Sequence, residues 1–588
     1  MDEYLKNVLY IDLSRKKFWI EDRRDLFEEY LGGVGVASKI LLEECPKNAN
    51  PLGPENVIVF AVGPLNGLFP LASKTVACFK SPLTKFYGES HAGGRSAVAI
   101  RQAGYGAIVI KGESETPVYV AVHGKNVLFR DASALWGLRN SITVGRVLRE
   151  IEGGAGVRTI MRIGVAGENL VTYASVNTET YRHFGRLGLG AVFGSKKLKA
   201  LVVSGKMTIP VSNAREYREL YDKIYMTSIK SSVMRKYHDL GTASNIIPLN
   251  TIHALPSKNL KESSFEYAEN ISGERLAEKY LGRRVACAHC PVACIHLASL
   301  REPYITEPYF YKTTMISYDH ELLYSLGSMI GVRDAEGVLK LIDEVEKWGI
   351  DAMMTGTVLA WMTEAYERGV VGETETLGLK LEWGSVGTYI KAIEYIVKRN
   401  NEFYKAASEG LDALSSRYGG KEFALSYGGN GMPGYHTGPG THITYLTGAR
   451  HSHLDSAGYS LDQETLKGKQ LSEKEIAEKL FHEESWRQIL SSLVVCFFSR
   501  GIYTPEIVCD ALNILGYNFN EEELKRLGKK ILRNKNNFRE REGFNMLNQK
   551  FPKRIFETPT PFGMLEEKSL YESVKEFYNL LKDFTQNV

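Results

Sequence analysis

The chain has 588 residues, 44% of them hydrophobic, and its 73 Lys and Arg residues nearly balance its 69 Asp and Glu residues. This length allows roughly three to four domains with large apolar cores, and the balanced charge gives no indication of nucleic-acid binding. No stretch approaches the roughly 18 consecutive apolar residues of a membrane span, and no apolar secretory segment follows the acidic N-terminus. We therefore expect a cytoplasmic protein with no nucleic-acid partner and no membrane span.

The first 208 residues are predicted to form a β-rich domain. A hairpin is expected over residues 7–21. Further apolar, β-branched runs of strand length, separated by glycines, occupy residues 57–62, 107–110, 118–122, 159–165 and 201–203. This pattern predicts a β-sandwich-like domain with many tight turns.

Helical periodicity replaces the strand pattern after about residue 210. It covers residues 214–240, 335–348, 352–368, 386–414, 473–498 and 521–532. A loop rich in Gly and Pro over residues 426–440 is expected to separate two helical domains. The predicted fold is therefore of the α+β class, with an N-terminal β-sandwich-like domain (1–208) followed by two mainly α-helical domains (209–420 and 421–588).

Three of the seven cysteines fall close together, as Cys287-x-x-Cys290-x-x-x-Cys294. An odd number of cysteines without a secretory signal argues against a disulfide framework. Short spacings let one loop wrap a compact metal centre, either an iron–sulfur cluster or structural zinc. Zinc usually requires a second ligand pair, so three local cysteines plus one distant cysteine favour a cubane cluster. Cys496 is the candidate for the distant ligand, and a core thiol on an apolar helix is the alternative.

Several glycine-containing segments, taken with this cysteine motif, give the chain a family resemblance. They are LGGVG at 31–35, GPLNG at 63–67, KSPLT at 80–84, AGYGAIVI at 103–110, GENL at 167–170 and GRLGLGAVFGSK at 185–196. In their order and content, the chain resembles the tungsten-containing aldehyde:ferredoxin oxidoreductase family nearly from end to end. The resemblance implies a tungsten-bis(molybdopterin) centre whose pterin phosphates are joined through Mg²⁺. It also implies one [4Fe–4S] cluster with Cys287, Cys290, Cys294 and Cys496 as ligands.

The resemblance places pterin contacts in glycine-containing segments, whose backbone N–H groups can cradle phosphate oxygens. The residues concerned are His91, Ala92, Gly93 and Gly94 in one segment and Arg182, His183, Gly185 and Arg186 in another. On its own, a Gly-Gly pair is also compatible with a simple turn. Lys74 stands where the family usually has an arginine between cluster and pterin, and lysine cannot make the same forked contact.

The family also has two Asp-x-x-Gly-Leu-type segments, each of which binds one pterin. The first corresponds to residues 346–351 here, with Glu346 in place of the leading Asp, followed by Gly349, Ile350 and Asp351. The second should cover residues 491–496, where Ser491 replaces the acid and valine replaces the glycine, with Val495 beside the last cysteine. This departure leaves open how the second pterin is held.

Glu321 corresponds to the family's active-site glutamate through the glycine-containing segments that follow it. An apolar pocket would raise its pKa toward a useful value, whereas a carboxylate stabilised at a helix N-terminus is the alternative. His453, in the segment RHSHL at 450–454, resembles the family's Arg-x-x-x-His-Leu shortened by one residue. We expect His453 to hydrogen-bond the substrate carbonyl, with His442 and His451 as competitors.

The resemblance implies oxidation of a small aldehyde with water to the carboxylic acid. The electrons would leave through the cluster to ferredoxin or a ferredoxin-like iron–sulfur small subunit. Arg283 and Arg284 precede the cysteine loop, where they either attract an acidic partner or are simply solvated. Lys340 and Asp343 replace the Glu-x-x-His that bridges dimers in some members, so a homo-oligomer is expected to form without a bridging metal.

Three other functions are compatible with the sequence: acid reduction, a specialised acyl or aromatic-acid reaction within the family, and a structural zinc protein. Because the resemblance implies that the protein supplies no ligand to the tungsten, tungsten and molybdenum are both compatible with the sequence. The sequence does not name the aldehyde either.

Overall fold

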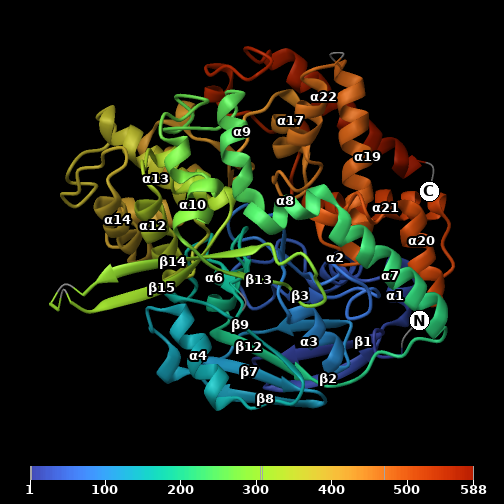
Figure 1. The fold of residues 1–588 in the computed structure, drawn as a ribbon. Coiled ribbons are helices and arrows are strands. Elements are labelled where there is room, and N and C mark those ends of the chain that lie inside the picture. The colour runs from blue at the N-terminus through green and yellow to red at the C-terminus, as the bar shows by residue number, and fades with distance from the viewer. Residues whose placement is uncertain (1–2, 180, 305, 308, 469–470, 587–588) are drawn as a thin grey trace.

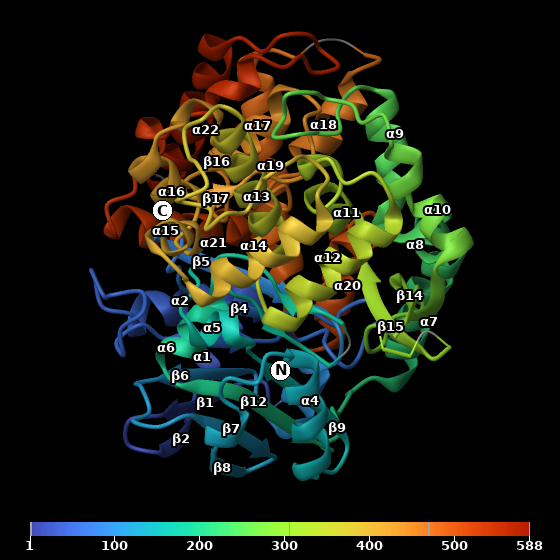
Figure 2. The same cartoon turned by 90° about the vertical axis from the view of Figure 1, so that its left-hand side faces the viewer.

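The computed structural model describes residues 3–179, 181–304, 306–307, 309–468 and 471–586. Figures 1 and 2 show the large sheets gathered at one end of the molecule and most of the helices at the other. This architecture confirms the predicted α+β class. Among the described residues, none of the helices combines the length and the apolar character that crossing a bilayer requires.

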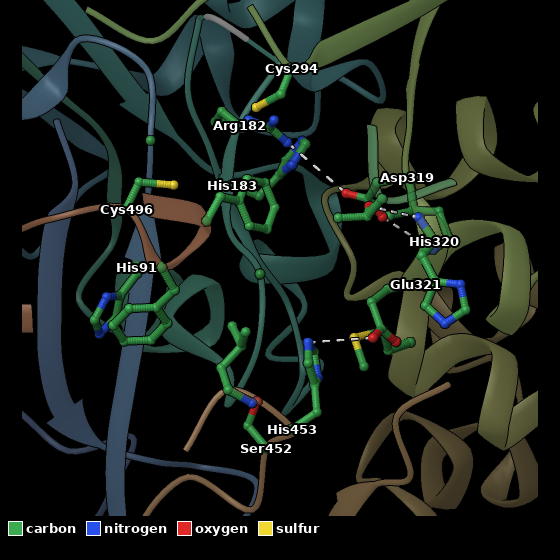
Figure 3. A pocket seen from close by; sticks show the side chains of 18 of the residues that line it. His91, Arg182, His183, Cys294, Asp319, His320, Glu321, Ser452, His453 and Cys496 are labelled. Atoms are coloured by element: carbon green, nitrogen blue, oxygen red, sulfur yellow. Dashed lines mark hydrogen bonds and ion pairs between the residues drawn. The ribbon is translucent and has the colours of Figure 1, made fainter. Parts of the chain in front are cut away.

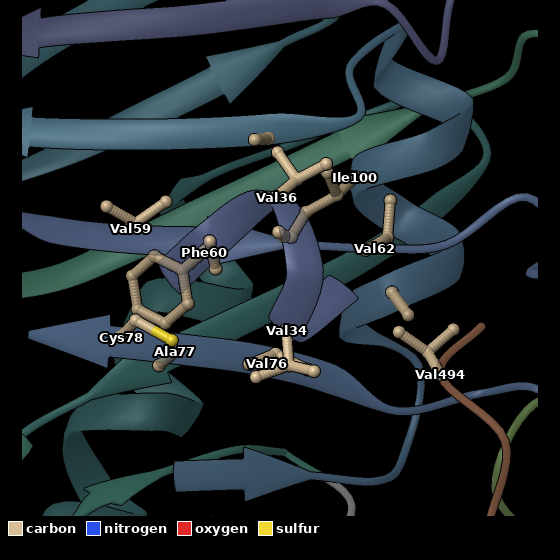
Figure 4. Close-up of a cluster of buried hydrophobic side chains, with 14 of the residues drawn as sticks. Val34, Val36, Val59, Phe60, Val62, Val76, Ala77, Cys78, Ile100 and Val494 are labelled. Carbon is tan, nitrogen blue, oxygen red and sulfur yellow. The ribbon is translucent and has the colours of Figure 1, made fainter. Parts of the chain in front are cut away.

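The first sheet contains the predicted hairpin. Over the described residues its order is β2-β1-β6-β3-β4-β5, with β1 (Asn7–Asp12), β2 (Lys17–Asp22), β3 (Ile58–Ala61), β4 (Thr75–Lys80), β5 (Tyr87–Ala92) and β6 (Ala107–Lys111). Strands β1 and β2 are antiparallel, whereas β1 and β6 are parallel. Figure 4 shows apolar side chains of β3, β4 and α2 (Gly33–Glu44) packed together with Val494 from the C-terminal part of the chain.

The second sheet follows in the chain and shares a core with the first. Its order is β11-β10-β9-β12-β7-β8, with β7 (Val118–His123), β8 (Asn126–Asp131), β9 (Val157–Arg162), β10 (Val176–Asn177), β11 (His183–Phe184) and β12 (Leu198–Gly205). Side chains alternate along β12. Leu201 and Val203 join the shared core, and Ala200 and Val202 pack toward α4 (Ser141–Ile151). The strands predicted from apolar runs are therefore confirmed, although the run over residues 159–165 is a strand only as far as Arg162, and β4, β5, β8, β10 and β11 were not predicted.

Three predicted helical runs end earlier or are interrupted. Residues 214–240 form α7 (Ala214–Lys230) and α8 (Ser232–Leu240), because the Ser231 hydroxyl accepts a hydrogen bond from the Met234 amide and caps a new helix. Residues 386–414 form three helices, since Arg399 adopts a φ of 55° after the first of them. Helix α19 (Glu473–Ser492) ends before residue 498, and Val494 has a φ of 56°.

The predicted helices over residues 335–348 and 352–368 lie near their expected bounds, whereas the one predicted over 521–532 continues to Arg541, and additional helices connect them. The remaining helices are α1 (Arg24–Tyr30), α3 (Ser96–Ala103), α5 (Val165–Glu168), α6 (Leu189–Ser195), α9 (Ile246–Thr251), α10 (Gly273–Lys279), α11 (His320–Ser325), α12 (Ala335–Trp348), α13 (Ala352–Glu367), α14 (Val386–Lys398), α15 (Glu402–Ser408), α16 (Leu411–Tyr418), α17 (Pro439–Thr447), α18 (Gly458–Thr465), α20 (Pro505–Ile514), α21 (Glu521–Arg541) and α22 (Glu567–Gln586).

An antiparallel sheet within the helical part was not predicted. It consists, over the described residues, of β13 (Leu281–Val285), β14 (Ile295–Pro303) and β15 (Tyr311–Tyr318), and β14 and β15 project from the body of the molecule (Figure 1). The cysteine loop joins β13 to β14, so this sheet holds both ends of the loop. The glycine-rich segment over residues 426–440 contains a small hairpin of β16 (Ser426–Tyr427) and β17 (Asn430–Gly431) and enters α17.

Candidate active site

A cavity of about 550 Å³ lies where the N-terminal sheets meet the helical part of the chain. Figure 3 shows that its side chains come from elements far apart in sequence, including the end of β5, the segment around β11, helix α11 and the segment before α18. The following predicted residues line it: Lys74, His91, Gly93, Arg182, His183, Gly185, Arg186, Cys287, Cys290, Cys294, Glu321, Glu346, Ile350, Asp351, His453, Val495 and Cys496.

The four cysteines of the predicted cluster are free thiols that line this one cavity. Leu71 joins their two segments through the backbone. Its N–H donates to the carbonyl of His289 at 3.0 Å, and its carbonyl accepts from the N–H of Cys496 at 2.9 Å. Cys496 follows the end of α19 in extended backbone, so the alternative of a core thiol within a helix is wrong.

Glycine leaves room for a thiol where β5 ends. A Cβ atom on Gly93 would lie 2.8 Å from Cys287 Sγ, closer than real Cβ contacts allow. The next residue also holds the loop, because the carbonyl of Gly94 accepts a hydrogen bond from the N–H of Ala288 at 2.8 Å. The segment predicted to touch a pterin therefore also positions the cysteine loop.

Two cationic side chains accompany the thiols. Burial lowers the pKa of the Arg182 guanidinium, but the nearby Cys294 and Cys287 outweigh burial and raise it overall. Burial raises the pKa of Cys294 to about 11, while Arg182 and Lys74 oppose that rise. This positive charge would stabilise thiolates over thiols once a metal centre binds.

A single metal ion fits these thiols poorly. In the described parts of the chain, no three His, Cys, Asp or Glu side chains are grouped as one ion requires. Zinc holds its sulfur ligands at about 2.3 Å and so draws them close together, whereas a multi-atom cluster leaves them farther apart. A cluster held by the four thiols stays a prediction.

Glu321 and His453 face each other in the cavity (Figure 3). The distance between Glu321 Oε1 and His453 Nε2 is 3.4 Å. Glu321 Oε2 accepts a hydrogen bond from the N–H of Gly434 at 3.1 Å. Asp319, rather than Glu321, caps α11 by accepting from the Leu322 amide.

Burial decides the protonation of this pair. It raises the pKa of Glu321 to about 8, with the Gly434 hydrogen bond opposing the rise and Asp319 adding to it. Burial also lowers the pKa of His453 well below its usual value, and Arg186 lowers it further. Both groups are therefore neutral near pH 7, and Glu321 gains its charge only at mildly alkaline pH.

The competing histidines have structural partners elsewhere. His442 lies between the Tyr427 hydroxyl at 2.5 Å and His436 at 2.9 Å, away from the cavity lining. His451 uses Nδ1 to bond the carbonyl of Tyr445 at 2.8 Å. His453 is thus the candidate that reaches the cavity.

The first predicted pterin segment joins the helical part to the second sheet. Glu346 bonds His183 at 2.8 Å, and Asp351 pairs with Arg186 at 3.5 Å. Gly349 adopts a φ of 72°, and its backbone approaches Gly164 so closely that a Cβ atom would lie 2.8 Å from the Gly164 nitrogen. Gly349 therefore packs where the helical part meets the second sheet, whereas Ile350 and Asp351 line the cavity.

The second predicted pterin segment, residues 491–496, lines the cavity only at its end. Ser491 is buried against the backbone of Gly33 and does not line the cavity, whereas Val495 does. The carbonyl of Val494 accepts a hydrogen bond from the N–H of Lys74 at 3.1 Å. The segment thus contributes backbone and the Cys496 thiol without the carboxylate found in the family's motif.

Several buried polar atoms at the cavity have no hydrogen-bond partner among the described residues. They are Arg182 Nε, Arg186 Nη1 and His453 Nδ1, together with atoms that reach only the longer ion pairs described above, namely Arg186 Nε with Asp351 Oδ2 and Glu321 Oε1 with His453 Nε2. Unpaired buried polar atoms are costly, so such a concentration indicates a site for a polar ligand.

Two family models together match most of the chain. The model described as "Aldehyde ferredoxin oxidoreductase, N-terminal domain" matches residues 8–205, and "Aldehyde ferredoxin oxidoreductase, domains 2 & 3" matches residues 219–582. The chain belongs to the aldehyde ferredoxin oxidoreductase family. The resemblance seen in the sequence is therefore confirmed.

Two of the relatives of this aldehyde ferredoxin oxidoreductase family member extend over nearly its whole length, and a third over about two-thirds of it. The tungsten-containing aldehyde ferredoxin oxidoreductase of Thermococcus kodakarensis is 31% identical over 94% of this chain and 92% of the relative. That of Pyrococcus furiosus is 30% identical over 97% and 94%. The WOR-like subunit of an aliphatic sulfonate oxidoreductase from P. furiosus is 28% identical over 68% and 65%.

A solved structure shares the fold at lower identity. It is the active site complex BamBC of benzoyl coenzyme A reductase in complex with 1,5-dienoyl-CoA, with a TM-score of 0.83 and 20% identity over 99% of this chain and 95% of that chain. At 20% identity, this likeness shows that the two chains share a fold, and it carries no conclusion about function.

In the structure of this family member, some residues predicted for the site do not line the cavity, and some residues that line it were not predicted. Ala92, Gly94, Gly349 and Ser491 do not line the cavity. Asp319, His320, Tyr435 and Arg450 do line it and were not predicted. Asp319 and His320 directly precede Glu321, and Arg450 opens the RHSHL segment, so proximity to the motifs could have found them. Tyr435 carries no such signal.

Proposed function

We propose that this protein oxidises aldehydes with water to carboxylic acids and passes the electrons to ferredoxin or a ferredoxin-like small subunit. The reaction is RCHO + H₂O → RCOOH + 2 e⁻ + 2 H⁺. The observation that supports it most is that one cavity brings together the thiols of Cys287, Cys290, Cys294 and Cys496 with Glu321 and His453. The family of the chain and the tungsten-containing relatives supply the rest of the argument.

The residues at the cavity fit the cofactors that this function requires. The four thiols would hold a [4Fe–4S] cluster, and the guanidinium groups of Arg182 and Arg186 would donate hydrogen bonds to the polar parts of two pterins. The Asp351 carboxylate would help to hold Mg²⁺ beside them. When bound, the tungsten–pterin centre supplies a two-electron acceptor and the cluster a one-electron relay. Arg182, which lies among the thiols and pairs with Asp319 at 4.0 Å, would position both groups.

Glu321 and His453 would handle the proton and the carbonyl. His453 is neutral and can donate an imidazole N–H to the substrate carbonyl oxygen, polarising it for attack. Ionised Glu321 can take a proton from water at its carboxylate oxygen, and the Gly434 N–H holds that carboxylate in place. The burial that raises the pKa of Glu321 also makes it a stronger base once ionised.

The proposed exit for electrons lies beside β13. Arg283 is exposed on this strand, and the Arg284 guanidinium donates to the carbonyls of His238 at 2.9 Å and Asp239 at 3.3 Å. Arg284 is thus held in place, while Arg283 is free to meet an acidic partner near the cysteine loop.

Turnover by the purified protein tests the proposal. Cofactor-loaded protein should reduce an artificial electron acceptor when supplied with aldehyde and form one carboxylic acid for every two electrons. Loaded protein that oxidises none of a panel of aldehydes would refute it.

A further inference from the structure

Aromatic rings surround the space next to Glu321 and His453. The Tyr435 ring lies 5.3 Å from that of His453 and 4.8 Å from that of His320, between ring centroids. On another side it stacks on Tyr459 at 4.4 Å with an interplanar angle of 20°. All four rings line the cavity.

The aromatic lining continues outward from Tyr459. Tyr237 on α8 lies near Tyr459 and Arg500 and stacks on Phe498 at 4.2 Å with an interplanar angle of 16°. Tyr237, Tyr459 and Phe498 are half-buried, whereas Tyr435 is only 4% exposed. Tyr435, Tyr459, Tyr237 and Phe498 therefore form an aromatic wall that runs from half-buried positions to the acid–base pair of Glu321 and His453.

The tyrosines of this aromatic wall come from segments other than those expected to hold the cofactors, whereas Phe498 follows Cys496 by two residues and Tyr237 lies near that thiol. Tyr237 belongs to α8, Tyr459 to α18 and Tyr435 to the loop before α17, whereas the thiols and pterin segments lie elsewhere in the chain. Pro248, Leu249 and Leu322 add apolar surface to the same lining. A substrate that binds along this wall must bring its reacting group to Glu321. The wall therefore contacts the rest of the substrate.

We propose that Tyr435, Tyr459 and Tyr237, with His320 and Phe498, form a chamber that selects planar aromatic aldehydes over aliphatic aldehydes of equal size. The inference rests on the proposed function and specifies its substrate class. Aromatic pairs gain from stacked and edge-to-face contacts beyond the area they bury. A saturated ring of the same carbon skeleton is bulkier and lacks the π-faces that make those contacts. An apolar pocket without aromatic selection would bind the saturated ring equally well or more tightly.

Binding of the product acid tests the chamber independently of turnover. Isothermal titration calorimetry on cofactor-loaded protein would compare benzoate with cyclohexanecarboxylate, which have the same carbon skeleton. We expect benzoate to bind about tenfold more tightly. Equal affinity, or tighter binding of cyclohexanecarboxylate, would overturn the inference.

Variants at Tyr459 connect the preference to the wall. Tyr459→Leu should reduce the benzoate preference to about twofold or less, whereas Tyr459→Phe, which keeps the ring, should retain it. Tyr578→Leu, on the half-buried face of α22 away from the cavity, controls for the general effect of this exchange. A preference that survives in Tyr459→Leu would contradict the role of the stacked ring.

Turnover then separates this inference from the proposed function. Benzaldehyde should exceed cyclohexanecarboxaldehyde in kcat/KM by about tenfold. If neither aldehyde nor any other is oxidised while benzoate still binds selectively, the proposed function fails and the aromatic chamber stands. If aldehydes are oxidised with the saturated ring preferred, the function stands and the chamber is wrong.

Discussion

Replacing Glu321 by Gln tests the base that the cavity provides. Burial raises the pKa of the wild-type carboxyl to about 8, so about one-tenth of it is ionised at pH 7 and half at pH 8. If the ionised form is the base, kcat/KM for aldehyde oxidation should rise about fivefold between these pH values and level off above pH 9. Glu321→Gln keeps the shape of the side chain but cannot ionise. It should lose about 100- to 10,000-fold in activity, together with this pH dependence.

The assay is aldehyde-dependent reduction of an artificial electron acceptor, measured from pH 6 to pH 9.5 at equal iron and tungsten content. A fully active Glu321→Gln enzyme would refute the catalytic role. A wild-type profile that falls through pH 8 would refute the assignment of the ionised form, since the sign of the pKa shift requires activity to increase with pH.

Three further substitutions test other parts of the site. Cys496→Ala should lower the iron content and abolish electron transfer to the acceptor, and a variant with full iron content would show that Cys496 is not a cluster ligand. Gly93→Ala places a methyl group against Cys287 Sγ and should destabilise the protein by about 1–3 kcal/mol with partial loss of iron, whereas Gly153→Ala, where a Cβ meets open space, should change the melting temperature and iron content little. Arg283→Ala should slow ferredoxin reduction several-fold at low ionic strength and little at high ionic strength; equal rates at both would exclude electrostatic attraction at this position.

The local sequence pattern predicted the framework of the fold better than the short elements that carry the site, since β5, β11 and α11 were not predicted. Apolar runs located β1, β2, β3, β6, β7, β9 and β12 of the two large sheets, and helix periodicity located α12 and α13 almost to the residue. The helix breaks were harder to see, because Arg399 and Val494 adopt positive φ without being glycine. Such backbone conformations depend on tertiary contacts more than on residue type.

The sheet around the cysteine loop could not be predicted from the sequence pattern either. Residues 281–285 are mostly exposed and read as neither strand nor helix, and they become a strand because β14 pairs with them. Strand pairing of this kind is decided by partners distant in sequence, which periodicity does not report.

The candidate site was predictable where a residue type carries the chemistry. Thiols, Glu321 and His453 were found through their motifs, and one cavity contains them all. Tyr435 could not be found this way, because it reaches the cavity from a glycine-rich loop with no chemical motif of its own. Ser491 was expected at the cavity because of its place in the motif, but the end of α19 packs it against Gly33 instead.

Metal analysis of the purified protein tests the central claim most directly. The arrangement of Cys287, Cys290, Cys294 and Cys496 around the cavity predicts about four iron atoms per chain, with tungsten and pterin in the same preparation. One zinc atom per chain, with neither iron nor tungsten, would contradict the account.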